Sequence, residues 1–180
     1  LSGYGLTEAP VLTMADVSDA DDELAVSEGK AMVGVELHIH RGDGSRAADG
    51  EDGEIRARGP QMMRGYLDPA LDLEAFDEDG FFCTGDLGHL DDRGNLVITG
   101  RIKDVIVRKG ENVSAKEVED LLITHPLLAD VAVIGIPDPD AGERVCAVVQ
   151  LADPSDSISL GEVVAHLRDA GLLTQKLPEQ

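Results

Sequence analysis

The sequence predicts a mixed α/β (α+β) fold, in which a β-rich unit is followed, near residue 100, by a smaller α/β module. Short runs of alternating apolar and polar residues, separated by turn residues, dominate the chain before that point. Two helix-start signals, each followed by apolar residues at helical spacing, occur only after it. Hydrophobic residues make up 42% of the chain and charged residues 28%, which is typical of a globular protein and not of a disordered one.

The β-rich part is predicted from three segments. Apolar residues alternate with polar ones from Val33 to Ile39, which is the period-two pattern of a half-buried strand. A second strand, residues 54–58, ends at Gly59-Pro60. Apolar runs at 87–90 and 96–99 flank a cluster of turn residues and suit a hairpin. We therefore expect a small antiparallel unit from about residue 30 to 100.

The α/β module follows from a different pattern. Val105 and Val107 suggest a strand that Gly110 ends. The residue pairs Ser114/Glu117 and Ser159/Glu162 have the spacing of capping boxes, and the apolar residues behind them predict two helices. Apolar runs at 129–136 and 144–151 predict strands between these helices.

The composition excludes several classes of partner. Fifteen Lys and Arg residues against 36 Asp and Glu give a formal net charge of -21, which repels nucleic acids and anionic membranes. No apolar run approaches the ~20 residues that a transmembrane helix needs. Two cysteines are too few for a disulfide framework, and a reducing cytoplasm fits them best.

Three possible reactive sites are set aside. The acidic stretch 16–28 lacks the Gly and Glu that a calcium loop requires at its sixth and twelfth positions, so we expect a solvated loop. His38 and His40 share a strand face with Glu36, but no fourth ligand is near in sequence, which favours an ordinary solvated face. Cys83 has no identifiable base beside it.

Two short motifs could bind a nucleotide. The segment 4–8, Tyr-Gly-Leu-Thr-Glu, places an aromatic ring, a hydroxyl and a carboxylate around a flexible glycine, a set that could contact a base, a phosphate and Mg²⁺. Asp86, on the glycine turn of residues 84–87, could accept both hydroxyls of a ribose. Taken alone, each motif is better explained as a structural turn.

Two further segments carry the basic residues of this acidic chain. Arg101, Lys103, Arg108 and Lys109 lie within nine positions, where one module gives way to the next. This cluster is the best local site for an anion, although a solvated linker also explains it. Residues 109–114 form a glycine loop that leads to a helix N-terminus, where free N–H groups suit an anion or a carbonyl oxygen.

Taken together, in this order and at this spacing, these motifs resemble the adenylate-forming superfamily of acyl-CoA synthetases, luciferases and peptide-synthetase adenylation domains. The resemblance covers nearly the whole chain. It is carried by YGLTE at 4–8, GEIRARGPQMMRGYL at 53–67, DGFFCTGDLGHLDDRGNLVITGRIKD at 79–104 and KGENVSAKEVEDLLITHP at 109–126.

The resemblance implies specific roles in nucleotide binding and adenylation. Tyr4 resembles the residue that lies against adenine, Thr7 the one that bonds the α-phosphate, and Glu8 the one that binds Mg²⁺. Asp86 matches the carboxylate that holds the ribose hydroxyls, and Arg101 matches a second ribose contact.

The resemblance also implies roles for the basic segments. Lys103 falls at the hinge about which the C-terminal domain turns between two half-reactions, and it stands with Thr7 and Glu8 among the expected catalytic residues. The loop of Lys109, Gly110 and Glu111 resembles the segment that approaches the pantetheine tunnel in the thioester step.

The implied parent enzyme is an AMP-forming acid–thiol ligase, an acyl-CoA synthetase. It activates a carboxylic acid, by expectation a fatty acid, as acyl-AMP with ATP and Mg²⁺ and transfers it to CoA, with no covalently bound cofactor. Residues 1–100 correspond to the C-terminal part of the AMP-binding N-terminal domain, and residues 101–180 to the mobile C-terminal domain. Acyl-AMP ligases that load carrier proteins, and a folded module without catalytic role, remain alternatives.

The resemblance further implies that the chain is a fragment. The family's phosphate loop and most of its acyl pocket lie upstream, and its catalytic Lys lies beyond residue 180; Lys176 matches the stretch before that Lys. We therefore expect no turnover by this chain alone. Surface that the upstream region would cover should be exposed and could promote self-association.

Overall fold

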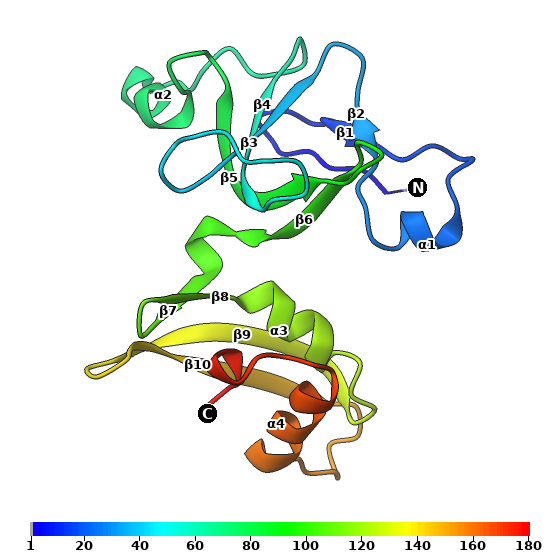
Figure 1. The fold of residues 1–180 in the computed structure, drawn as a ribbon, viewed down its shortest axis with the longest axis vertical. Helices are drawn as coiled ribbons and strands as arrows, with labels where there is room; N and C mark the ends of the chain where they lie inside the picture. Colours follow the sequence, from blue (N-terminus) through cyan, green and yellow to red (C-terminus); the bar gives the residue numbers. More distant parts are fainter. Residues whose placement is uncertain (1) are drawn as a thin grey trace. The chain divides into compact units, whose positions relative to one another are not determined.

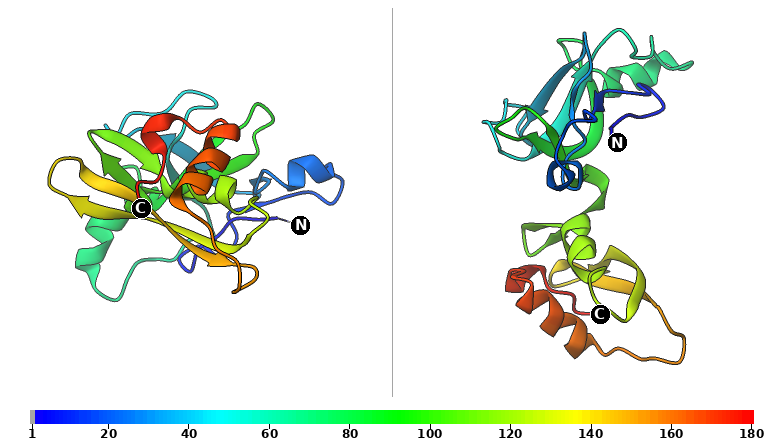
Figure 2. Two further views of the ribbon diagram at one scale, coloured as in Figure 1. Left: turned by 90° about the horizontal axis from the view of Figure 1, so that it is seen from below. Right: turned by 90° about the vertical axis from the view of Figure 1, so that its right-hand side faces the viewer.

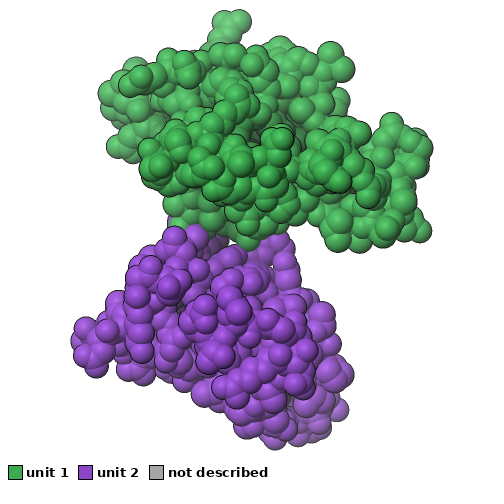
Figure 3. Space-filling view, viewed as in Figure 1, with its two compact units in different colours: residues 1–102 green, residues 103–180 purple. Residues whose placement is uncertain are grey.

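The computed structural model describes residues 2–180. The chain divides after residue 102 into two compact units, the second of which is residues 103–180 (Figure 3). The mixed α/β fold class predicted from the sequence is confirmed, since strands predominate and the helices are few and short (Figure 1). No helix within the described residues has the length and apolar character needed to cross a lipid bilayer.

The first unit is built on a four-stranded antiparallel sheet in the order β3-β4-β5-β6, with a separate two-stranded pair, β1-β2. Its elements are β1 (Thr13–Met14), α1 (Asp21–Leu24), β2 (Lys30–Ala31), β3 (Glu36–His40), β4 (Gly53–Arg58), α2 (Pro69–Ala75), β5 (Phe82–Leu90) and β6 (Leu96–Arg101). The predicted strands at 54–58 and the predicted hairpin at 87–99 are confirmed as β4 and as β5–β6.

The two faces of this sheet differ in character. One face is apolar because Ile39, Ile55 and Ala57 alternate with polar neighbours, and it packs against Leu96 and side chains of the N-terminal segment. The opposite face carries the polar partners of the same strands, including the cross-strand pair Glu36 and Arg58. Burial of the apolar face stabilises the sheet and places the N-terminal segment over it.

The second unit begins with a short 3₁₀ turn and contains a sheet in the order β8-β7-β10-β9. Its elements are β7 (Val105–Arg108), β8 (Glu111–Ser114), α3 (Ala115–Leu122), β9 (Leu128–Asp138), β10 (Gly142–Leu151), α4 (Leu160–Asp169) and a 3₁₀ turn (Thr174–Lys176). Both helices lie over the same face of the sheet (Figure 2, left). Val118, Leu122, Val145 and Leu167 are buried between these layers.

The helices of this unit begin where the sequence predicts. The Ser114 side chain accepts a hydrogen bond from the Glu117 backbone N–H at 3.3 Å. Ser159 and Glu162 form a complete capping box, in which each side chain bonds the other residue's backbone N–H. Such caps satisfy N–H groups that the first turn of a helix leaves without partners.

The structure differs from the prediction at several elements. The strand predicted at 33–39 is observed as β3 (Glu36–His40), because Val33 and Gly34 lie in a turn, and the β1–β2 pair was not predicted. Residues 16–28 contain the short helix α1 within the expected loop. Helix α2 was not predicted, although Asp68 as N-cap and Pro69 at the first helical position are a recognised start signal. Residues 111–114 are strand β8 and not a loop, so Lys109 and Gly110 form the turn of a β-hairpin.

The C-terminal segment is fastened to the same hairpin. Arg108 donates from its guanidinium to the Gln175 carbonyl and to the Glu179 carboxylate, both at 2.5 Å. The Glu179 backbone N–H also donates to Val145 of β10 at 2.9 Å. These contacts hold the chain's last residues along β10.

The hairpin turn yields the first prediction. Lys109 has a φ of 51°, and it is the one residue other than glycine with a positive φ among those that the structure describes. Asn tolerates this conformation better than Lys, and Asn-Gly is the preferred pair for such a turn. Lys109→Asn should therefore raise the free energy of unfolding by up to about 1 kcal/mol, measured by urea denaturation.

The matched control uses the same position. Lys109→Val removes the same charge but introduces a β-branched residue, which the left-handed region disfavours, and it should lower stability. Equal free energies of unfolding for the two variants would show that the positive φ of Lys109 does not strain the turn.

Candidate functional site

The N-terminal motif forms a tight turn that presents two side chains. Leu6 and Ala9 exchange backbone hydrogen bonds of 2.9 and 3.1 Å, so Thr7 and Glu8 occupy the tip. A Cβ on Gly5 would lie 2.2 Å from the Pro10 carbonyl oxygen, so this position requires glycine. Thr7 is exposed, whereas Glu8 is half-buried.

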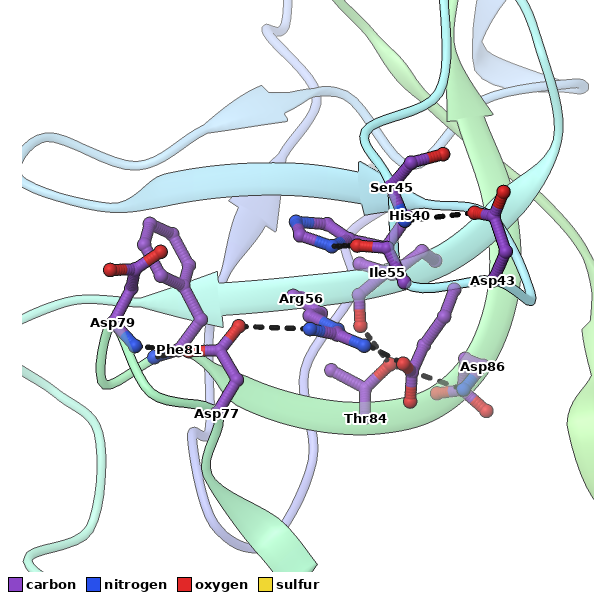
Figure 4. A network of polar contacts seen from close by, with 12 residues as sticks. His40, Asp43, Ser45, Ile55, Arg56, Asp77, Asp79, Phe81, Thr84 and Asp86 are labelled. Atoms are coloured by element: carbon purple, nitrogen blue, oxygen red, sulfur yellow. Dashed lines mark hydrogen bonds and ion pairs between the residues drawn. The ribbon is translucent and has the colours of Figure 1, made fainter.

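Strand β5 bulges where it carries the second motif. Opposite the single residue Ile55 of β4, β5 places three residues, Thr84, Gly85 and Asp86, and Gly85 has a φ of 72°. The Thr84 hydroxyl donates to the Ile55 carbonyl at 2.7 Å, and its oxygen accepts from the Asp86 backbone N–H at 3.1 Å (Figure 4). The Thr84 side chain thus replaces ladder hydrogen bonds that the bulge removes.

The Asp86 carboxylate is held by two groups from distant parts of the sequence. The Tyr4 hydroxyl donates to Oδ2 at 2.7 Å, and Arg101 Nε donates to Oδ1 at 2.8 Å. The Asp86 side chain is 7% exposed, so its charge requires such partners. Burial, together with the hydrogen bond to Asp86, raises the pKa of Tyr4, which keeps its hydroxyl a donor.

Glu8 has a partner that the sequence did not reveal. The Tyr66 hydroxyl donates to Glu8 Oε1 at 2.8 Å, although the two residues are 58 positions apart. The hydrogen bond to Glu8 raises the pKa of Tyr66. Both side chains line an open groove of about 460 Å³, which Thr84 and Cys83 also border.

A nucleotide and a magnesium ion fit these residues in different ways. Each Asp86 oxygen carries one protein hydrogen bond and can accept a second from a ribose hydroxyl. Within the described residues no group of three or more His, Cys, Asp or Glu side chains could hold a metal ion. Mg²⁺ bound to phosphates commonly takes only one or two protein carboxylates, and Glu8 could supply one.

The structure places the remaining predicted residues as follows. Tyr4 is 7% exposed and belongs to the core of the first unit, so its contact with adenine stays a prediction beside its observed bond to Asp86. Lys103, Lys109, Gly110 and Glu111 are exposed and belong to the second unit. Their roles in the hinge and in the thioester step also stay predictions.

The comparisons with known proteins agree with this geometry. Residues 1–67 match the profile of the AMP-binding enzyme family, and residues 117–178 match that of the AMP-binding enzyme C-terminal domain. Together the two profiles cover well over half of the chain. The chain belongs to the AMP-binding enzyme family. The resemblance to adenylate-forming enzymes that the motifs suggested is therefore confirmed.

Family members with described activities are similar along nearly all of the chain. A medium-chain fatty-acid–CoA ligase of Escherichia coli (strain K12) is 41% identical over 180 residues, which is 99% of this chain and 32% of that protein. A salicyl-AMP ligase / salicyl-S-ArCP synthetase of Mycobacterium tuberculosis is 37% identical over 98% of this chain and 31% of its own length. The chain thus spans about a third of the length of these curated relatives.

Solved structures of the family share the fold. ATP-bound MatB from Rhodopseudomonas palustris matches with a TM-score of 0.90 at 35% identity, over 98% of this chain and 35% of that one. An o-succinylbenzoate CoA synthetase from Bacillus subtilis, in complex with its acyl-adenylate intermediate, matches with a TM-score of 0.87 at 33% identity, over 99% of this chain and 36% of that one.

The Tyr66–Glu8 contact predicts a spectroscopic change. Glu8→Gln removes the negative charge beside the Tyr66 hydroxyl, so the pKa of Tyr66 should fall toward its ordinary value of 10.0. The chain has two Tyr and no Trp, so near-ultraviolet absorbance during a pH titration follows tyrosine ionisation alone. Tyr4 ionises at higher pH because it is buried, which separates the two steps.

The control for this titration is Glu74→Gln. Glu74 borders the same groove without a hydrogen bond to Tyr66, so the pH at which Tyr66 ionises should not change.

The raised pKa of Tyr66 also makes the stability of the protein depend on pH. The folded-state pKa of Tyr66 is raised, so the bond stabilises the protein below about pH 10 and is lost as pH rises further. If Tyr66 ionises at the same pH in Glu8→Gln as in the unchanged chain, the hydrogen bond between Tyr66 and Glu8 is disproved.

Proposed function

We propose that this chain works as part of an ATP-dependent acyl-CoA synthetase, an acid–thiol ligase that forms acyl-AMP and transfers the acyl group to CoA. The observation that carries the proposal is the Asp86 carboxylate, held between the Tyr4 hydroxyl and Arg101 and able to accept two ribose hydroxyls. The 41% identity to a fatty-acid–CoA ligase supports CoA as acceptor and a fatty acid as substrate.

In this proposal the residues of the first unit bind and orient the nucleotide. Asp86 accepts from the ribose hydroxyls, and the positive charge of Arg101 offsets the charge of Asp86. Thr7 donates from the exposed tip of its turn to the α-phosphate, and Tyr4 lies against adenine. Tyr66 orients the Glu8 carboxylate that would hold Mg²⁺. The ion, when bound, would offset negative charge on the phosphates.

The domain assignment is part of the proposal. Residues 1–100 would be the C-terminal part of the AMP-binding domain, and residues 101–180 the C-terminal domain, which turns about Lys103 between the two half-reactions. The compact units of the structure divide after residue 102, which supports this assignment. The exposed turn of Lys109 and Gly110, with Glu111 beside it, would then approach CoA in the thioester step.

Three further points extend the proposal. The chain alone should show no turnover, because its relatives are about three times as long. Self-association is supported by apolar side chains of the first unit that are almost fully exposed, Val33 at 98%, Leu67 at 107% and Leu73 at 84%. Both cysteines are free, which suits the cytoplasm.

The main alternative is an acyl-AMP ligase that loads a carrier protein. It is favoured by the 37% identity to a salicyl-AMP ligase / salicyl-S-ArCP synthetase. A folded module without catalytic role is the other alternative, and it predicts no protection by ATP at all.

The deciding experiment uses the full-length protein that contains this chain. AMP release is followed with ATP, Mg²⁺ and a panel of carboxylic acids, with and without CoA. We expect AMP with a matching acid only when CoA is present. Acid-dependent exchange of pyrophosphate that CoA never converts into AMP release would instead identify the acyl-AMP ligase. Absence of any ATP-dependent reaction with every acid would refute both enzymes.

The same enzyme tests the role of Asp86. Asp86→Asn removes the charge that Arg101 pairs with and weakens the acceptor for the ribose hydroxyls. The KM for ATP should rise by about 10- to 100-fold, with a smaller change for the acid. Asp92→Asn, in the exposed turn between β5 and β6, is the matched control and should leave both values unchanged. A KM for ATP that Asp86→Asn does not alter would exclude the ribose contact.

A further inference from the structure

The bulge of β5 is bracketed by a cluster of charged side chains on the polar face of the sheet. Arg56 lies directly opposite Cys83, the last paired residue before the bulge, and Glu54 lies opposite Leu87, the first paired residue after it. Arg56 Nε donates to Glu54 Oε2 at 3.0 Å, so the two side chains close across Ile55. The charged pair therefore spans the same gap in the ladder that Thr84 fills from the other strand.

Arg56 also fixes the turn that leads into β5. Its Nη1 donates to Asp77 Oδ2 at 3.0 Å (Figure 4). The other oxygen of Asp77 accepts from the backbone N–H groups of Phe81 at 2.9 Å and of Asp79 at 3.1 Å. Arg58 adds a bond from the exposed side, to the Asp79 carbonyl. One guanidinium thus links β4 to the turn that leads into β5, two residues before the bulge.

The side chains of this cluster are mostly buried, so an unpaired charge among them would be unfavourable. The side chains of Arg56, Glu54 and Asp77 are 17%, 17% and 15% exposed. Burial opposes the charge on Asp77, yet the hydrogen bonds from Phe81 and Arg56 lower its pKa. Burial and the nearby Glu54 raise the pKa of the Cys83 thiol, so it adds no charge. Loss of Arg56 would leave two mostly buried carboxylates without the cation that they share.

We propose that Arg56 is a positioning residue for nucleotide binding, because it holds β4, the turn 77–81 and β5 in the arrangement that presents Asp86. Arg56 acts through the bulge and does not touch the nucleotide itself. The inference rests on the proposed function for the role of Asp86, whereas the mechanical link from Arg56 to the bulge stands on the contacts alone.

The test compares Arg56→Met with Arg41→Met in the full-length enzyme. Arg41 also pairs with a carboxylate of the first unit, Glu51, but lies in the loop after β3 and contacts neither the turn nor the bulge. Arg56→Met should raise the KM for ATP about tenfold and change the KM for the acid by less than about twofold. Arg41→Met should leave both at the wild-type values.

A second substrate separates positioning from a general loss of folded enzyme. Wild-type enzyme should prefer ATP to 2′-deoxy-ATP, because Asp86 accepts from the ribose hydroxyl that the analogue lacks. Misplacement of Asp86 in Arg56→Met should reduce this preference about tenfold, whereas a smaller folded fraction alters both substrates equally. An active Arg56→Met enzyme with the wild-type preference and KM would overturn the inference.

Two further measurements test the inference if Arg56→Met does not fold or if the enzyme shows no ATP-dependent turnover. Asp77→Asn retains the acceptor for the Phe81 N–H but removes the charge that Arg56 pairs with, so it should give a milder change in the same direction if Arg56→Met does not fold. Hydrogen exchange should be about tenfold faster in peptides of residues 82–90 of Arg56→Met than in those of Arg41→Met. Equal exchange would disprove the link to the bulge. A wild-type enzyme without ATP-dependent turnover would disprove the role of Arg56 in nucleotide binding. Hydrogen exchange alone would then decide whether Arg56 holds the bulge in place.

Discussion

The buried carboxylate of Asp86 is the constraint on which the first unit depends. A buried charge is unfavourable unless it is paired and hydrogen-bonded, and Asp86 obtains its partners from Tyr4, 82 positions earlier, and from Arg101 at the end of the next strand. The same contact fixes the N-terminal segment over the sheet, where Leu12 is fully buried. Electrostatic pairing and apolar packing therefore fix one arrangement of three separate segments.

Two irregular stretches of backbone coincide with motifs that the sequence predicts to be functional. The ladder between β4 and β5 is regular on both sides of residues 84–86 and is interrupted only there, and the strained φ of Lys109 lies at the tip of the hairpin β7–β8. Bulges and rare backbone conformations persist where surrounding contacts enforce them. In this protein those contacts are the Thr84 hydroxyl, the guanidinium of Arg56 and the close approach of Lys109 N–H to the Ala141 carbonyl at 2.7 Å.

Local patterns predicted much of the fold, because strand alternation and helix caps are short-range signals. The strand predicted at 33–39, observed at 36–40 as β3, and the helix starts at Ser114 and Ser159 were recognisable from a few neighbouring residues. Strand β8 was not, because Glu111 and Asn112 are polar and its pairing with β7 depends on the turn at Lys109. The partners of Glu8 and Arg56 lie 58 and 21 positions away, and no periodicity connects such pairs. The roles of Tyr66 and Asp77 could therefore be recognised only in the folded structure.

The cluster around Arg56 also limits how this sequence can change. Glu54 and Asp77 each pair with Arg56, so a neutral residue at position 56 would leave two carboxylates without a cation. Replacement of either acid would remove one of the two ion pairs beside the bulge. Drift at these three positions is therefore coupled. Among descendants of this sequence, the three codons should vary together, with an apolar residue at position 56 accompanied by uncharged residues at 54 and 77.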